Sequence, residues 1–146
     1  MSDHTDGEID EAVLMKYMWG DEESVKRFLA RRRSPLSDAH AQLMASANEQ
    51  LWSRRVLPLK TMALVNLGIL AALNRPHELH TRLRGLLRAG VRPEELREVL
   101  LQVAFYCGNP AGVDALTMLV DAVDESRELG YLVHEPEVPD GWSPRS

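Results

Sequence analysis

Proline and glycine divide most of this chain into segments of helical length. Four segments open near a proline, at Pro58, Pro76, Pro93 and Pro110, where the first turn of a helix tolerates the missing N–H. Several of them close at a glycine, as helices commonly do. Strict alternation of apolar and polar residues is absent, and β-branched residues are sparse. We therefore predict an all-α fold, a compact bundle of about six to seven helices.

Apolar periodicity gives the approximate bounds of these helices. They are predicted at residues 8–19, 21–33, 37–52, 58–73, 76–89, 93–108 and 109–129. The segment 58–73 is apolar nearly all round, so we expect it at the centre of the core, with Asn66 in need of a hydrogen-bond partner. Two stripes are predicted to pack inward, Leu43, Met44, Ala47 and Leu51 on one helix and Leu79, Leu83, Leu86 and Leu87 on another.

The length of 146 residues suits one domain, which we place at residues 9–130. Residues 1–8 are short, polar and terminal, so we expect them to be disordered. Residues 131–146 hold three prolines, which favours an extended C-terminal arm over a helix.

Charge and composition exclude several classes of function. The formal net charge of −5 does not favour a nucleic-acid partner. The apolar run at residues 62–73 is shorter than the roughly 20 residues that cross a bilayer, and the acidic N-terminus resembles no signal sequence, so we expect a cytoplasmic protein without membrane contact. A single cysteine leaves no dithiol motif, and the five histidines have no metal-ligand spacing.

Three stretches together resemble a known family. They are "MKYMWGDEESVKR", "EQLWSRR" and "NRPHELHTRLRGLLRAGVRPEELREVLLQVAFYCGNPAG". They are similar to the carboxymuconolactone decarboxylase family, small all-helical proteins that share their fold with alkyl hydroperoxidase D. The resemblance covers roughly residues 11–125 and is most specific between Glu78 and Ala111.

The resemblance also selects a branch of that family. The hydroperoxidase branch carries two cysteines where this chain has Arg75 and Glu78, which rules out its dithiol chemistry. The decarboxylase branch has arginine and glutamate at those two positions, as here. It also keeps a histidine thought to take part in catalysis, and Arg82 stands at that position in this chain.

A second departure lies near Trp52. The family commonly has a carboxylate two residues before this tryptophan, where this chain has Gln50, with Glu49 one position earlier. A shift of one residue turns a helical side chain by about 100°, so Glu49 is not a simple substitute for the expected acid.

These comparisons give a set of candidate site residues. We expect catalytic roles for His80, Arg82 and Glu49, and substrate contacts from Gln50, Trp52, Arg75, Glu78, Tyr106 and Cys107. Four of these residues also have a plainer interpretation. Arg82 either pairs with Glu78 or holds an anion through its guanidinium group. His80 either caps the core edge or transfers protons, Tyr106 is more often a core residue, and Cys107 is more often a small buried one.

The resemblance implies a cofactor-independent enzyme that acts on a small carboxylated lactone or related organic acid. Decarboxylation, or a related isomerisation or cyclisation, would pass through an enolate-like intermediate, and no metal or organic cofactor is required. The alternative is a non-catalytic ligand-binding or structural homo-oligomer that has lost the family activity. In either case we expect a homo-oligomer, because short apolar helices leave surface to cover, and the family resemblance implies a trimer or hexamer.

Overall fold

Six helices make up most of the computed structural model, which describes residues 9–17, 34–131 and 134–144. They are α1 (Glu11–Tyr17), α3 (Pro35–Trp52), α4 (Leu59–Ala72), α5 (Pro76–Arg88), α6 (Pro93–Cys107) and α7 (Asn109–Glu128). No strand occurs in those three ranges, which confirms the predicted all-α class. The predicted helix at 21–33 and the expected disorder at 1–8 lie outside the described residues.

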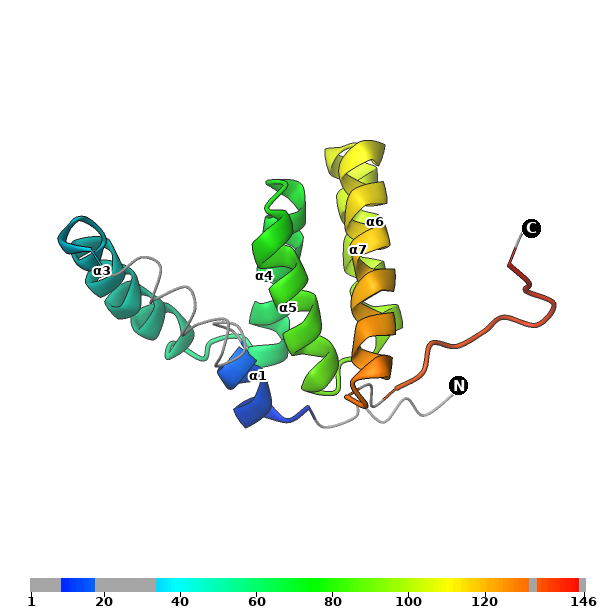
Figure 1. Ribbon diagram of the computed structural model, residues 1–146, viewed down its shortest axis with the longest axis horizontal. Helices are drawn as coiled ribbons and strands as arrows, with labels where there is room; N and C mark the ends of the chain where they lie inside the picture. The colour runs from blue at the N-terminus through cyan, green and yellow to red at the C-terminus, as the bar shows by residue number, and fades with distance from the viewer. Residues whose placement is uncertain (1–8, 18–33, 132–133, 145–146) are drawn as a thin grey trace.

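Helices α4 to α7 form a four-helix bundle (Figure 1). Helix α7 packs along α5 and α6, and α4 packs against both α5 and α6. Helix α1 contacts α5, where the backbone N–H of Asp10 donates to the carbonyl oxygen of Ala89 at 3.0 Å. The turn between α6 and α7 passes through Gly108 at φ +104°, a conformation that favours glycine.

Polar contacts join the starts of α4 and α6. The Nζ atom of Lys60 lies 2.6 Å from Oε1 of Glu95, and the backbone N–H of Arg92 donates to Oε2 of the same carboxylate at 3.2 Å. Partial burial raises the pKa of Glu95, but the hydrogen bonds from Lys60 and Arg92 outweigh it and leave this pKa below its usual value. The contact between Lys60 and Glu95 thus links α4 to α6 at one end of the bundle.

The core of the bundle consists mainly of leucine, alanine and valine. The predicted stripe on α5 is confirmed, since all four of its leucines are buried. They pack with the buried residues of the neighbouring helices, Leu59, Ala63, Leu67, Ala71, Leu96, Leu100, Val103, Ala115, Leu119, Ala122 and Val123.

The prediction that segment 58–73 lies at the centre of the core is wrong for one of its faces. Val65, Ile69 and Leu73 remain 53%, 51% and 60% exposed, because α4 has neighbours on only part of its circumference. The sequence predicted a hydrogen-bond partner for Asn66. Within the described part of the chain, however, its buried Oδ1 atom accepts no hydrogen bond.

Helix α3 points away from the four-helix bundle (Figure 1). Its predicted inward stripe does not pack against the described residues, since Leu43, Met44 and Leu51 are exposed. Its last residue, Trp52, belongs to the buried core. The helix begins at Pro35 and not near Ser37, consistent with the tolerance of a first turn for proline.

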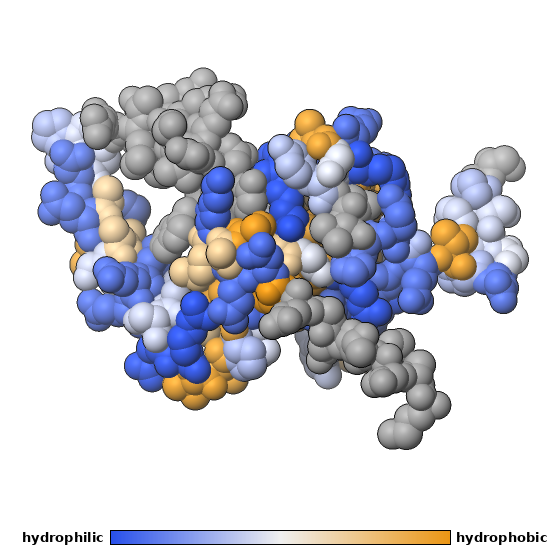
Figure 2. All heavy atoms as spheres, turned by 90° about the horizontal axis from the view of Figure 1, so that it is seen from below, coloured by the Kyte–Doolittle hydropathy of each residue, from blue (hydrophilic) through white to orange (hydrophobic). Residues whose placement is uncertain are grey.

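The C-terminal segment 134–144 contains no helix and extends from the bundle (Figure 1). Its start is held by an ion pair of 2.7 Å between Nη2 of Arg127 and Oε2 of Glu135. On the face shown in Figure 2, apolar patches interrupt a mostly hydrophilic surface. None of the described helices is long and apolar enough to cross a membrane.

Candidate functional site

A pocket of about 550 Å³ lies where α1, α3 and the segment after α3 meet. It is lined by Met15, Ala45, Asn48, Glu49, Trp52, Ser53 and Arg55. This volume lies within the range of small-molecule sites, about 300–1,000 Å³. The lining combines an indole ring, a thioether, an amide, a hydroxyl, a carboxylate and a guanidinium group.

The helical repeat explains which side chains of α3 reach the pocket. Ala45, Asn48, Glu49 and Trp52 follow the spacing i, i+3, i+4, i+7, which places them on one face. Gln50 is turned away from the lining, and its Nε2 atom donates to Oγ of Ser46 at 3.1 Å. Glu49 therefore shares the pocket with Trp52, although the family pattern favoured the position of Gln50.

Arg55 is the cation of this lining and was not among the residues selected from the sequence. It follows the end of α3 in the left-handed region at φ +51°, and its Nη1 atom lies 3.1 Å from Oε2 of Glu11 on α1. The stretch "EQLWSRR" contained this residue but gave no reason to choose it over Arg54. The contact with Glu11 depends on where α1 lies, which no local pattern reports.

His80 lies outside this pocket, on the side of α5 that faces α7. Its Nε2 atom is 3.1 Å from Oε2 of Glu125, and Nε of Arg84 is 3.6 Å from the same oxygen. Arg84 thus joins His80 and Glu125 in a polar cluster between α5 and α7. The structure does not bring His80 together with Glu49.

Arg82 is largely buried on α5, and this burial lowers the pKa of its guanidinium group to about 10. Arg75 and Glu78, the other two family positions on this helix, are exposed. None of these three residues belongs to the lining of the 550 Å³ pocket.

Tyr106 and Cys107 lie at the C-terminal end of α6, also outside the pocket. The interpretation of Cys107 as a buried residue is wrong, because it is exposed. Tyr106 is 77% exposed and contacts Phe105 edge to face, with ring centroids 5.0 Å apart, so it is not a core residue either. Both side chains at this end of α6 therefore lie outside the buried core.

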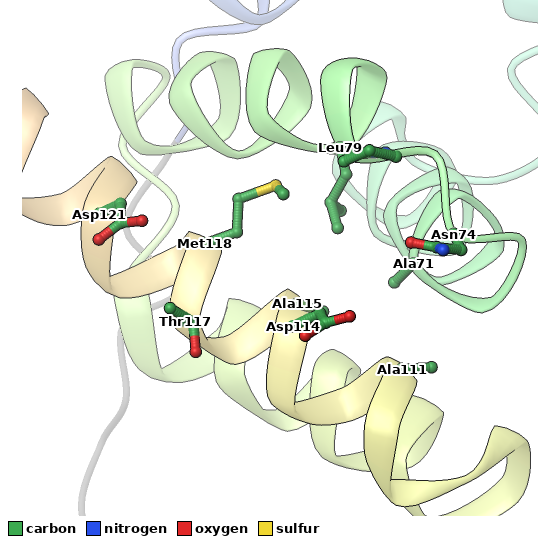
Figure 3. Close-up of a pocket in the computed structure, with 10 residues that line it drawn as sticks. Ala71, Asn74, Leu79, Ala111, Asp114, Ala115, Thr117, Met118 and Asp121 are labelled. Carbon is green, nitrogen blue, oxygen red and sulfur yellow. The ribbon is translucent and has the colours of Figure 1, made fainter.

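A second pocket, of about 390 Å³, lies between α7 and the end of the α4–α5 hairpin (Figure 3). Leu79 and Met118 point toward one another across it, and Asp114 and Asp121 line the α7 side. Its lining contains none of the candidate site residues selected from the sequence. Among the residues the structure describes, no three histidine, cysteine, aspartate or glutamate side chains gather in a way that could hold a metal ion.

Residues 38–121, more than half of the chain, match the model of one protein family, described as the carboxymuconolactone decarboxylase family. The chain belongs to the carboxymuconolactone decarboxylase family. This confirms the resemblance inferred from the sequence motifs. The matched segment contains Glu49, Trp52 and Arg55, whereas Glu11 and Met15 on α1 precede it.

Two relatives are named decarboxylases. A 4-carboxymuconolactone decarboxylase from Acinetobacter baylyi is 38% identical over 81 residues, covering 56% of this chain and 58% of the relative. A nitrosuccinic acid decarboxylase from Metarhizium robertsii is 30% identical over 80 residues, covering 55% of this chain and 56% of the relative. The chain thus matches rather more than half the length of each of these two carboxymuconolactone decarboxylase family relatives.

Proposed function

We propose that this protein is a cofactor-independent enzyme that acts on a small carboxylated lactone or related organic acid in the 550 Å³ pocket. The observation that carries the proposal is the meeting of Glu49 and Trp52, both candidate residues from the sequence, in one pocket with the cation Arg55. The names of the two decarboxylase relatives support an organic acid as substrate.

The proposed reaction needs one group that moves a proton. When the carboxylate leaves as carbon dioxide, the electron pair of the broken carbon–carbon bond remains on the substrate as an enolate. A proton from solvent must then reach the enolate carbon, and in this proposal Glu49 relays it, taking the proton up from water and passing it to the carbon. Trp52 and Met15 supply apolar surface beside the intermediate.

Arg82 is a second candidate, supported by the family position and by its buried charge. A guanidinium group is a poor proton donor at neutral pH, so its contribution would be electrostatic. If Arg82 holds the acid, Arg82→Lys keeps the charge but loses the two-pronged geometry and weakens binding by about 1–3 kcal/mol. Unchanged affinity would remove Arg82 from the site.

The test measures carbon dioxide released from 4-carboxymuconolactone and from nitrosuccinic acid, the substrates that the relatives' names give. Glu49→Gln should lower release by about 100-fold or more, the size of a lost proton-transfer group. Glu128→Gln makes the same chemical change at an exposed residue of α7 and should leave release unchanged. Equal rates for the two variants would exclude Glu49 from catalysis.

One observation favours a second function, a non-catalytic ligand-binding homo-oligomer. His80, the nearest histidine to the changed family position, contacts Glu125 and does not share the pocket of Glu49. In that case the wild-type protein would bind the acids and release no carbon dioxide from either. The exposed apolar residues Val65 and Ile69 of α4 support self-association under both functions.

A further inference from the structure

Arg55 is the positively charged residue of the pocket lining, and its guanidinium group already contacts a carboxylate of the same chain. Nη1 of Arg55 lies 3.1 Å from Oε2 of Glu11, which belongs to α1 and is not itself part of the lining. The two residues are 44 positions apart in the sequence, so the contact exists only because α1 lies beside the end of α3.

The pair is accessible to an incoming ligand. The side chains of Arg55 and Glu11 are 44% and 57% exposed, and ion pairs at such exposure contribute little to stability because water screens them. The contact also uses one nitrogen of a group that can bind a carboxylate with two. A ligand carboxylate that engages both prongs would therefore replace Glu11 at small cost.

The rest of the lining indicates what such a ligand looks like. Trp52 is buried and offers an aromatic ring, and Met15 offers a polarisable apolar side chain. The combination fits a small acid with one carboxylate at Arg55 and a flat or apolar body beside Trp52.

We propose that Arg55 is the residue that binds the carboxylate of the substrate, and that Glu11 is an internal competitor which the substrate displaces. The proposal rests on the proposed function for the identity of the ligand as a small organic acid. Glu11 lowers the affinity for acids and leaves the affinity for neutral molecules unchanged. Glu11 precedes residues 38–121, the segment matched to the family model.

The experiment uses benzoate and its neutral analogue benzamide as probes of the full chain, with affinities measured by NMR titration. Arg55→Gln should weaken benzoate binding at least tenfold and leave benzamide binding unchanged. Glu11→Gln should strengthen benzoate binding about three- to tenfold, again with no change for benzamide. In the double variant Glu11→Gln with Arg55→Gln, the gain from the Glu11 substitution should disappear.

Arg54→Gln is the matched control, since Arg54 is the exposed neighbour of Arg55, lies outside the lining and carries the same charge. It should leave both affinities unchanged. A loss of benzoate binding in Arg54→Gln equal to that in Arg55→Gln would overturn the proposal in favour of general charge attraction. No gain in Glu11→Gln would equally overturn it.

Failure of the proposed function gives a different result. If neither probe binds the wild type or Glu11→Gln, the pocket is not a small-acid site, and both proposals are wrong. If both probes bind and Arg55→Gln has no effect on benzoate, the pocket still takes small molecules but another group holds the carboxylate.

Discussion

A close approach of two helices in the described chain predicts the effect of a single methyl group. Helices α6 and α7 meet at Ala104 and Gly112, and a Cβ atom added to Gly112 would lie 2.2 Å from Cβ and 2.7 Å from Cα of Ala104. Carbon atoms in contact pack at about 3.5–4.0 Å. Gly112→Ala therefore forces the two helices apart by more than 1 Å, roughly, if the methyl group is to reach that distance.

The expected loss follows from two opposing effects. Overpacking of a filled interior costs typically about 1–3 kcal/mol, and the obstruction here includes backbone that cannot rotate away. Replacing glycine by alanine returns up to about 1 kcal/mol of helix propensity, less in the first turn where Gly112 stands. We expect a net destabilisation of about 2 kcal/mol.

Gly68→Ala provides the matched control on α4. The added Cβ would lie 3.5 Å from Cγ1 of Val99, an ordinary contact, so this variant should be stabilised by up to about 1 kcal/mol. Exchanging the methyl group between the helices, with Ala104→Gly and Gly112→Ala together, should recover only part of the stability lost by Gly112→Ala alone, because the Cα atom of residue 104 stays 2.7 Å from the added Cβ.

Urea unfolding followed by far-ultraviolet circular dichroism, at one fixed protein concentration, gives the free energies of unfolding. The reasoning predicts opposite signs for the two glycine variants and partial rescue by the exchange. A Gly112→Ala protein as stable as the wild type would refute the close approach of α6 and α7. Failure of the exchange to rescue would place the obstruction elsewhere.

Three further predictions concern a buried charge, a buried amide and the exposed stripe of α4. Burial lowers the pKa of Arg82 to about 10, so between this pH and the usual pKa of arginine the unfolded state binds more protons than the folded state. The stability of the wild type relative to Arg82→Gln should therefore rise with pH in that range, by at most about 1.4 kcal/mol per pH unit; urea unfolding at pH 9 and pH 11 tests this, and parallel changes would contradict it. Asn66→Leu removes a buried oxygen without a donor among the described residues and should stabilise the protein by about 1 kcal/mol in the same assay, whereas a loss would mean that a donor outside the described chain is being removed. The wild type should sediment as a trimer or hexamer, and Ile69→Glu should shift it toward smaller species; a monomeric wild type at micromolar concentration would exclude the expected assembly.

The sequence alone determined most of the local structure. Proline at first turns and the 3.6-residue repeat gave the bounds of α4 to α7 to within one or two residues, because these signals act through hydrogen bonds between neighbours in the chain. The leucine stripe of α5 was correct for the same reason, and three motif stretches, most specific from Glu78 to Ala111, together indicated the family.

Periodicity shows that a face is apolar, but it does not show what covers that face. The stripes on α3 and on the outer side of α4 have the same pattern as the stripe on α5, yet Leu51 and Ile69 are exposed because no other helix of the described chain reaches them. Both errors have one physical cause: burial depends on the placement of neighbouring elements, which lies outside any local window.

Part of the candidate site could likewise be predicted from the sequence, and part of it depended on the tertiary structure. The spacing of Glu49 and Trp52 on one helix could have been used from the sequence, since i and i+3 share a face. The contacts of Arg55 with Glu11 and of His80 with Glu125 join residues 44 and 45 positions apart, and no periodicity links them. Only the tertiary arrangement of α1 beside the end of α3, and of α7 beside α5, decided which charges meet, because an ion pair forms where two chain segments approach within a few ångströms.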